Sequence, residues 1–174
     1  MVVQNSLQQT LNWYVAYTYP QAEKKVDRML CERGIISFLP LQKVIRQWSD
    51  RKKKLEVPLF PNYIFLQATE IQRFEALNIK ELVRYVSFEG RPTILNQKDI
   101  ENIRLINKKQ VAVEVEPIDH FKLGMKIRII VGQLKGLEGL LIRKNGHQRL
   151  LIQIEALGQA VSVEIPAAYT QIIR

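Results

Sequence analysis

Cysteine, histidine and long apolar runs are scarce in this chain of 174 residues, and each shortage excludes a class of protein. The single cysteine, Cys31, excludes an internal disulfide and a multi-cysteine metal site. No apolar run approaches the length that spans a bilayer. The first ten residues are polar and lack the pattern of a signal peptide. We therefore expect a cytoplasmic protein in which Cys31 is an inert, small packing residue of a helix.

Motifs that support catalysis are also missing. The two histidines, His120 and His147, lie far apart in the sequence, and neither has a nucleophile pattern beside it. The chain has no glycine-rich phosphate loop, no paired-carboxylate motif and no metal-ligand spacing. The sequence therefore predicts a protein that is not an enzyme and that binds neither a metal nor another cofactor.

Positive charge is present in excess, and it is distributed unevenly. The net charge is +9, and residues 1–109 hold 18 lysines and arginines against 11 acidic residues. Residues 110–174 hold only 8 basic and 6 acidic residues. An excess of this size favours a polyanionic partner, nucleic acid above all, for the N-terminal part. Improved solubility alone is the alternative interpretation.

The N-terminal part mixes strand patterns with helix patterns. Aromatic and β-branched residues over 12–18 predict a strand, and apolar residues at helical spacing over 21–33 predict a helix that ends at Gly34. Asn96 is a suitable N-cap for a helix over 97–109. The other expected elements are strands at 35–39, 41–49 and 83–87, a hairpin tip at 50–54 and a helix at 70–77. Residues 55–66 predict a strand near their end, and Pro58 and Pro61 indicate an edge position or a bulge at its start.

The C-terminal part has a different character. Residues 111–120 alternate valine with glutamate before Pro117 and predict a linker. From Phe121 onward the pattern is entirely that of strands and turns, and Asn145-Gly146 is the strongest hairpin signal in the chain. The expected strands are 125–131, 140–143, 149–155, 160–165 and 170–173. Five short strands in so few residues indicate a small closed barrel over 121–174.

Two blocks of sequence carry a family resemblance. WYVAY at 13–17 and PLFPNYIFL at 58–66 resemble the N-terminal (NGN) domain of the NusG family, and LGMKIRI at 123–129 with GQLKGLEG at 132–139 is similar to the KOW motif. The matching KOW residues are Gly124, Lys126, Arg128, Gly132, Gly136 and Gly139. The resemblance implies an α+β NGN domain over 10–110, with an antiparallel sheet flanked by helices, and then an all-β KOW barrel.

The resemblance also implies a partner. NusG-like proteins bind the clamp helices of the RNA polymerase β′ subunit through an apolar depression on the NGN domain, and they promote processive elongation. The positions that match this depression are Tyr17, Phe60, Pro61, Tyr63 and Phe65. Aromatic side chains give a large contact area at a low cost in entropy, as interface hot spots do. The alternative is that they are core residues, Phe65 above all, because alternate strand positions face inward.

A basic hairpin is the second candidate site. Arginines and lysines with an interleaved tryptophan can contact phosphate and stack on an unpaired base. The hairpin residues are Lys43, Arg46, Trp48, Arg51, Lys52, Lys53 and Lys54, and the first helix adds Lys24, Lys25 and Arg28. In the family this side of the domain lies near upstream DNA and the displaced strand. A hairpin that is merely solvated, or that faces the polymerase, is the alternative.

Departures from the family pattern distinguish further hypotheses. General NusG carries a GRxTPVEL pattern where this chain has residues 158–165, and Gly-Pro-Phe where it has 132–134. In general NusG this domain meets the termination factor Rho or a ribosomal protein. The PLFPNYIF wording resembles specialised paralogues such as RfaH and the UpxY-type antiterminators of polysaccharide operons. We therefore favour an operon-specific antiterminator. A housekeeping NusG elongation and termination factor, or a KOW-type RNA-binding protein of the ribosome, are the alternatives.

RfaH-like paralogues can also store the C-terminal domain as a helical hairpin. Asn145-Gly146 and the β-branched strand residues of this chain favour the barrel, so we expect no helical alternative.

Overall fold

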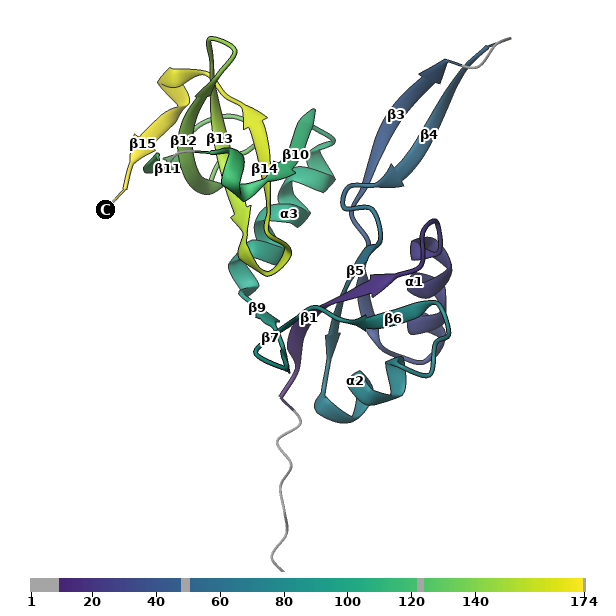
Figure 1. Cartoon of the computed structure of the whole chain (residues 1–174). Coiled ribbons are helices and arrows are strands. Elements are labelled where there is room, and N and C mark those ends of the chain that lie inside the picture. The colour runs from purple at the N-terminus through teal and green to yellow at the C-terminus, as the bar shows by residue number, and fades with distance from the viewer. Residues whose placement is uncertain (1–9, 48–50, 122–123, 174) are drawn as a thin grey trace, which may run out of the picture. The chain divides into compact units, whose positions relative to one another are not determined.

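The computed structural model describes residues 10–47, 51–121 and 124–173, and the chain forms two compact units (Figure 1). The first unit contains residues 1–39 and 60–95, and the second contains residues 40–59 and 96–174. Each unit is described separately below. Among the described residues, every helix falls short of the length and apolarity that a membrane crossing needs.

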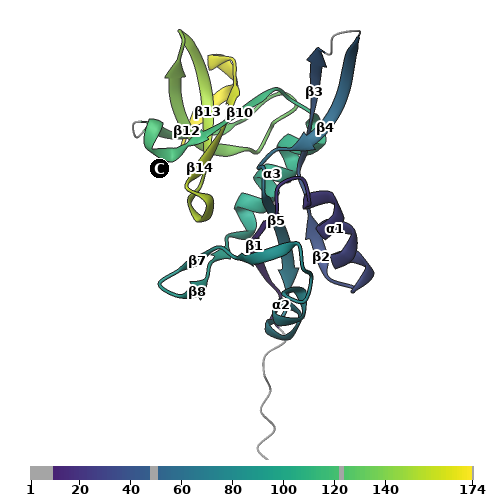
Figure 2. The same ribbon diagram turned by 45° about the vertical axis from the view of Figure 1, so that its right-hand side comes forward.

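The first unit is built on an antiparallel sheet with the strand order β2-β5-β1-β6, and a short strand, β9, also pairs with β1. The strands are β1 (Asn12–Thr18), β2 (Ile36–Phe38), β5 (Tyr63–Ala68), β6 (Leu82–Tyr85) and β9 (Ile94–Leu95), and the helices are α1 (Glu23–Glu32) and α2 (Glu70–Ala76). Strands β7 (Ser87–Phe88) and β8 (Arg91–Pro92) form a short ribbon beside the sheet (Figure 2). This unit confirms the expected α+β class.

The core of the first unit lies between the helices and one face of the sheet. Val26 and Leu30 of α1 are fully buried and belong to one cluster with Ile64 and Leu66 of β5. Burial of each such side chain contributes about 1.5–3 kcal/mol. Cys31 lies on the other side of α1 and is exposed, so the prediction of a packing role for this residue is wrong. The helix buries its Val26–Leu30 stripe, which leaves Cys31 facing solvent.

Local signals in the sequence set the ends of the helices. Gly34 has a φ of +69° directly after α1, as the expected left-handed helix end requires. Thr69 and Gln72 form a reciprocal capping box at the start of α2. The Asn96 side chain accepts a hydrogen bond from the Lys98 backbone amide at 2.9 Å and caps α3 (Gln97–Lys109) over the residues that the sequence predicted.

A long two-stranded hairpin belongs to the second unit and consists of β3 (Leu41–Gln47) and β4 (Lys52–Pro58). The sequence placed the hairpin tip at 50–54, and this is wrong for 52–54 because β4 already begins at Lys52. The expected strand near the end of 55–66 is confirmed as β5, and the irregularity predicted from the two prolines is a complete break, because the chain turns between Pro58 and Tyr63. Two prolines without a backbone N–H donor, together with Asn62 at a φ of +68°, account for this break.

The second unit also contains a six-stranded antiparallel sheet with the order β10-β14-β13-β12-β11-β15, and α3 contacts β13. Its strands are β10 (Val113–Pro117), β11 (Met125–Ile129), β12 (Glu138–Lys144), β13 (His147–Ile154), β14 (Gln159–Glu164) and β15 (Thr170–Ile172). Strands β11 to β15 are the five expected ones, which confirms the all-β class. The sixth strand, β10, lies in the segment that the sequence predicted as a linker. It is a strand because it pairs with β14, which is distant in the sequence.

Candidate functional site

One row of side chains crosses the face of the first sheet that is opposite the helices. The strand register places Tyr63 of β5 directly opposite Tyr17 of β1, and Tyr17 directly opposite Arg84 of β6. The two tyrosine ring centroids are 4.8 Å apart, and the Arg84 guanidinium carbon lies 4.9 Å from the Tyr17 centroid. Directly opposite residues share a face, so three strands present the Tyr63–Tyr17–Arg84 row together. Both tyrosines are half-buried and Arg84 is exposed.

The two phenylalanines of the predicted site lie beneath the surface. Phe60 is 1% exposed and Phe65 is 0% exposed. Their ring centroids are 5.7 Å apart in an edge-to-face arrangement, and Phe65 also packs against Phe38 at 5.9 Å. Pro61, in contrast, is exposed in the turn before β5. The predicted site therefore contains accessible residues (Tyr17, Pro61 and Tyr63) and buried ones (Phe60 and Phe65). Phe65 is packed as a core residue, which is the alternative that the sequence left open.

The environment of the row changes the chemistry of Tyr63. Burial, strengthened by a hydrogen bond to Tyr17 and by the charge of that neighbour, raises the pKa of Tyr63 to about 12, while Arg84 opposes the shift. The phenol therefore stays neutral near neutral pH and keeps a proton that it can donate. This combination of a half-buried ring and a polar hydroxyl suits a protein interface.

A hollow of about 570 Å³ lies beside the row and is lined by β6, α2 and the start of the β7–β8 ribbon. Three exposed apolar residues contribute to it, namely Phe74, Leu77 and Val83. Tyr17 and Arg84 line the same hollow, so it is continuous with the row. The sequence prediction missed this part of the surface. Tyr17 lies far from Phe74 and Val83 in the chain, and only the packing of α2 and β6 with β1 brings them to one place.

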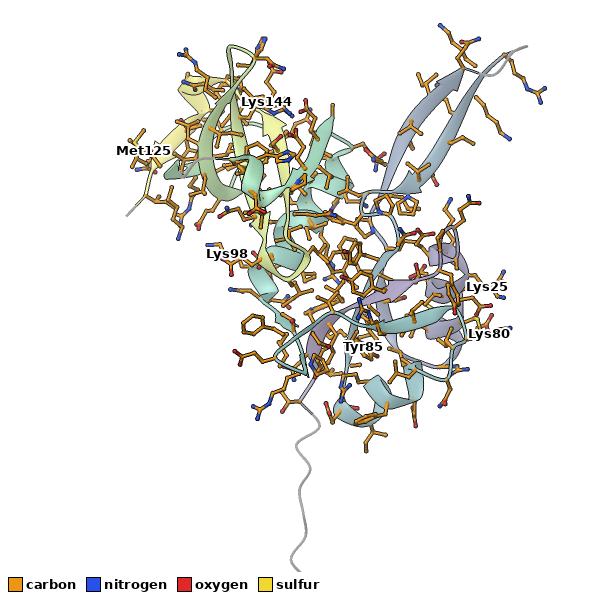
Figure 3. The ribbon with its side chains drawn as sticks, in the orientation of Figure 1. Lys25, Lys80, Tyr85, Lys98, Met125 and Lys144 are labelled. Carbon is orange, nitrogen blue, oxygen red and sulfur yellow. The ribbon has the colours of Figure 1, made fainter. Side chains whose placement is uncertain are left out.

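Arg73 fixes the position of α2 along this hollow. Its guanidinium forms an ion pair with Glu70, lies 4.2 Å from the Phe74 ring centroid and 5.4 Å from that of Tyr85. The Tyr85 hydroxyl donates a hydrogen bond of 2.8 Å to the Arg73 carbonyl oxygen (Figure 3). The hydrogen bond to Arg73 also holds the pKa of the Glu70 carboxyl below its usual range. The two contacts with Tyr85 join α2 to β6 along one side of the hollow.

The basic residues of the hairpin lie on two different faces. Because direct partners share a face, Lys54 lies beside Ile45 and Lys52 beside Gln47, on the same face as Lys43. Lys53 pairs with Arg46 and therefore lies on the opposite face. The exposed cations of the hairpin are Lys43, Arg51, Lys52, Lys53 and Lys54. Trp48 lies outside the described residues, and so does the tip at 48–50.

The three basic residues of α1 belong to the first unit, whereas the hairpin belongs to the second. Lys25 forms an ion pair with Glu81 at 2.6 Å, next to Lys80 (Figure 3). Arg28 approaches Glu32 at 3.9 Å, and Lys24 is exposed. This cluster is a separate basic surface, partly neutralised by its own acidic neighbours.

The glycines of the expected KOW motif meet a packing requirement. A Cβ atom at Gly124 would lie 2.1 Å from the Leu141 carbonyl oxygen, and one at Gly139 would lie 2.3 Å from the Leu151 carbonyl oxygen. Neither position accepts a side chain without movement of the backbone. Gly132 and Gly136 lie in the turn between β11 and β12.

The two cations of the motif differ in their surroundings. Arg128 donates to Glu138 at 2.7 Å, and Glu138 also accepts from Lys98 of α3. These bonds hold the pKa of the Glu138 carboxyl below its usual range. Lys126 is exposed on β11. Among the described residues, no group of three or more metal-ligating side chains is placed to hold an ion.

Comparison with known proteins identifies the family of this chain. Residues 11–104 match the family model described as "Transcription termination factor nusG". The transcription termination/antitermination protein NusG of Lactococcus lactis subsp. lactis is 27% identical over 167 residues, which cover 88% of each chain. The NusG of Rickettsia bellii is 24% identical and covers 98% of this chain and 94% of its own.

A solved structure of Thermotoga maritima NusG shares the fold, with a TM-score of 0.50 and 21% identity over 95% of this chain and 98% of that one. The fold thus has an N-terminal α+β part and a C-terminal all-β sheet, and the matched family model covers more than half of the sequence. This chain belongs to the NusG family of transcription factors.

Proposed function

We propose that this protein is a transcription elongation and antitermination factor, without enzymatic activity, that binds the clamp helices of the RNA polymerase β′ subunit. The Tyr63–Tyr17–Arg84 row and its adjoining hollow carry the proposal. An α-helix can place apolar side chains in the hollow while its polar groups meet the Tyr63 hydroxyl and Arg84. Pro61 is exposed in the turn before β5, and Phe60 and Phe65 are buried.

Direct binding tests this proposal. We expect the wild-type protein to capture purified RNA polymerase, and a fragment that carries the β′ clamp helices should compete for it. The matched variants are Tyr63→Ala and Tyr169→Ala, because Tyr169 is an exposed tyrosine of the second unit. If the wild-type protein fails to bind the clamp helices, the proposed binding to RNA polymerase is wrong.

The basic hairpin is proposed as the nucleic-acid contact. Lys43, Lys52 and Lys54 share one face and can follow a phosphate backbone, while Lys53 occupies the other. Arg46 is proposed as a further contact, although its side chain lies outside the described part of the hairpin. Lys24, Lys25 and Arg28 of α1 are proposed as a further contact near the transcription bubble. A hairpin that contacts DNA or RNA should lose affinity steeply as salt rises, because bound counterions are released from the phosphates.

The proposed physiological role is processive transcription of specific operons of the polysaccharide type. This finer role rests on the PLFPNYIF motif and on the differences from the general NusG pattern at 132–134 and 158–165. A housekeeping role, with Rho or the ribosome as the partner of the second unit, is the competing hypothesis. Run-off transcription on a template with a long untranslated leader distinguishes the two. Increased read-through confined to such templates supports the specialised role, whereas stimulated Rho termination supports the housekeeping one.

A further inference from the structure

Strand β10 covers one edge of the six-stranded sheet. Its only neighbour in the strand order is β14, and the register runs from Val113↔Val163 to Pro117↔Gln159. Without β10, β14 would present unpaired N–H and C=O groups along its outer side. The segment that connects α3 to β11 therefore also covers a sheet edge.

The cover is held by charges that cross two strands. Lys144 of β12 lies 2.7 Å from one Glu114 carboxylate oxygen and also bonds Glu116, while Arg149 of β13 lies 3.0 Å from the other Glu114 oxygen (Figure 3). Hydrogen bonds from Lys144, followed by the charge of Arg149, hold the pKa of the Glu114 carboxyl below its usual value of 4.5. Both glutamates of the Val-Glu repeat thus form ion pairs with cations of the sheet, Glu114 with Lys144 and Arg149 and Glu116 with Lys144.

Arg149 is built into the sheet rather than placed on its surface. It is 8% exposed, donates from Nε to the Ser162 hydroxyl at 3.0 Å and donates from Nη2 to the Ser162 carbonyl oxygen at 3.1 Å. The third nitrogen, Nη1, remains for the carboxylate of β10. A buried guanidinium that loses its carboxylate is costly, so the β14 edge favours an acidic strand beside it.

The apolar half of the repeat faces the other way. Val113 lies opposite Val163, and Val115 lies opposite Val161, and both partners on β14 are buried. The edge therefore selects an extended segment with apolar residues on one face and carboxylates on the other. β10 itself has only five residues, ends in a proline, and is held by ion pairs that reach the surface. An exposed pair contributes about 0–1 kcal/mol, whereas removing the carboxylate from the buried Arg149 is costly. A segment that replaces β10 must therefore supply a carboxylate at the same place.

We propose that the β14 edge is a docking site for an extended acidic segment of a partner protein. In this proposal β10 is an intramolecular competitor that the segment displaces. The partner would add a strand to the sheet, with main-chain hydrogen bonds for affinity and with Lys144 and Arg149 for specificity. Since β10 is tethered beside its site, it competes at a high effective concentration. The covered edge is the closed state of the second unit. This inference needs no polymerase and stands apart from the proposed clamp-helix grip.

The test uses the full chain in the absence of polymerase, so that its outcome is independent of that grip. The release variant carries Glu114→Lys and Glu116→Lys, and the probe is a fluorescent peptide with the sequence VAVEVEPID of residues 111–119. We expect the release variant to bind the probe roughly tenfold or more tightly than wild type, because the internal competitor is lost. Binding should weaken with salt, and the matched peptide VAVKVKPID should not bind.

A second variant, in which a disulfide holds β10 on β14, tests the opposite case. Val115→Cys with Val161→Cys joins two directly paired positions in a Cys31→Ser background. Oxidation should abolish probe binding and protect the β14 amides from hydrogen exchange, and reduction should restore the behaviour of wild type. A matched control places the cysteines at Arg143 and Gln148, a pair on β12 and β13 away from this edge.

Three outcomes overturn the proposal. The first is a folded release variant that does not bind the probe. The second is equal binding of the acidic and the charge-reversed peptides. The third is self-association of the release variant without probe binding, which would make a second copy the occupant of the edge. Circular dichroism of each variant establishes that the sheet is intact.

Discussion

The Tyr63–Tyr17–Arg84 row lies on a sheet whose central strands are buried, whereas the β3–β4 hairpin is a two-stranded ribbon with exposed cations on both faces. The row depends on short-range packing, because its positions are set by strand register and by the contact between the two tyrosine rings. The hairpin depends on charge, which acts over about 8–10 Å at physiological salt and tolerates imprecise placement. The two surfaces should therefore respond differently to substitution and to ionic strength.

The largest expected effect comes from removing the buried support of the row. Phe65→Ala should lower the free energy of unfolding by about 3–5 kcal/mol, because it leaves a cavity against Phe60 and Phe38. Lys54→Ala in the hairpin should change it by less than about 0.5 kcal/mol. Urea unfolding measures both. Equal destabilisation by the two substitutions would contradict the distinction between packed and charged surfaces.

The next effect concerns binding through the row. Tyr63→Ala should weaken polymerase binding by about 1–3 kcal/mol, as the loss of an interface tyrosine does, whereas Tyr169→Ala should leave it unchanged. Titration calorimetry with a clamp-helix fragment provides the measurement. The fold must be intact in both variants. An unchanged affinity of a folded Tyr63→Ala variant would remove this residue from the proposed site.

Salt dependence distinguishes the hairpin from other basic segments. Replacing Lys52 and Lys53 by alanine should flatten the logarithmic salt dependence of single-strand binding by about 0.7 for each phosphate contact that is lost. The matched control replaces Lys108 and Lys109, a basic pair at the end of α3. Fluorescence anisotropy at several salt concentrations gives both slopes. Identical slopes for the hairpin variant and wild type would refute the nucleic-acid contact.

The smallest expected effect is a change in the pKa of Tyr63 within the row. Tyr17→Phe removes a hydrogen bond that helps to raise the pKa of Tyr63 to about 12, so that pKa should fall toward 10. A raised pKa means that the neutral phenol is favoured in the folded state. Its contribution to stability is present below pH 10 and is lost as the pH rises through about 12. NMR of tyrosine ring carbons measures this titration, and a Tyr63 pKa unchanged by Tyr17→Phe would show that the hydroxyl pair has no role in the shift.

Elements with strong local signals could be predicted from the sequence. The strand over 12–18 and the helix over 97–109 have the predicted bounds, because a run of aromatic and β-branched residues and an Asn96 cap specify them locally. The hairpin tip was wrong for residues 52–54, and the expected linker forms a paired strand over part of its length. The register of β4 and the pairing of β10 depend on partners that are distant in sequence or on turn geometry, which a single-sequence pattern does not encode.

The candidate site divides in the same way. Tyr17 and Tyr63 could be found from their motifs, but neither Arg84 nor the apolar residues of α2 carried a signal. Arg84 reads as an ordinary strand cation, and Phe74 reads as part of an amphipathic helix. Their role follows from the position of β6 beside β1, which no local pattern fixes.

The sequence by itself determined the α+β and all-β classes, the excess of positive charge on the first 109 residues and the aromatic motif, because composition and periodicity are local properties. The tertiary structure alone decided which aromatics are buried, which hairpin lysines share a face, and that a Val-Glu segment is the edge strand of a sheet. Burial, register and edge pairing depend on which distant segments meet, and that is settled only when the chain packs.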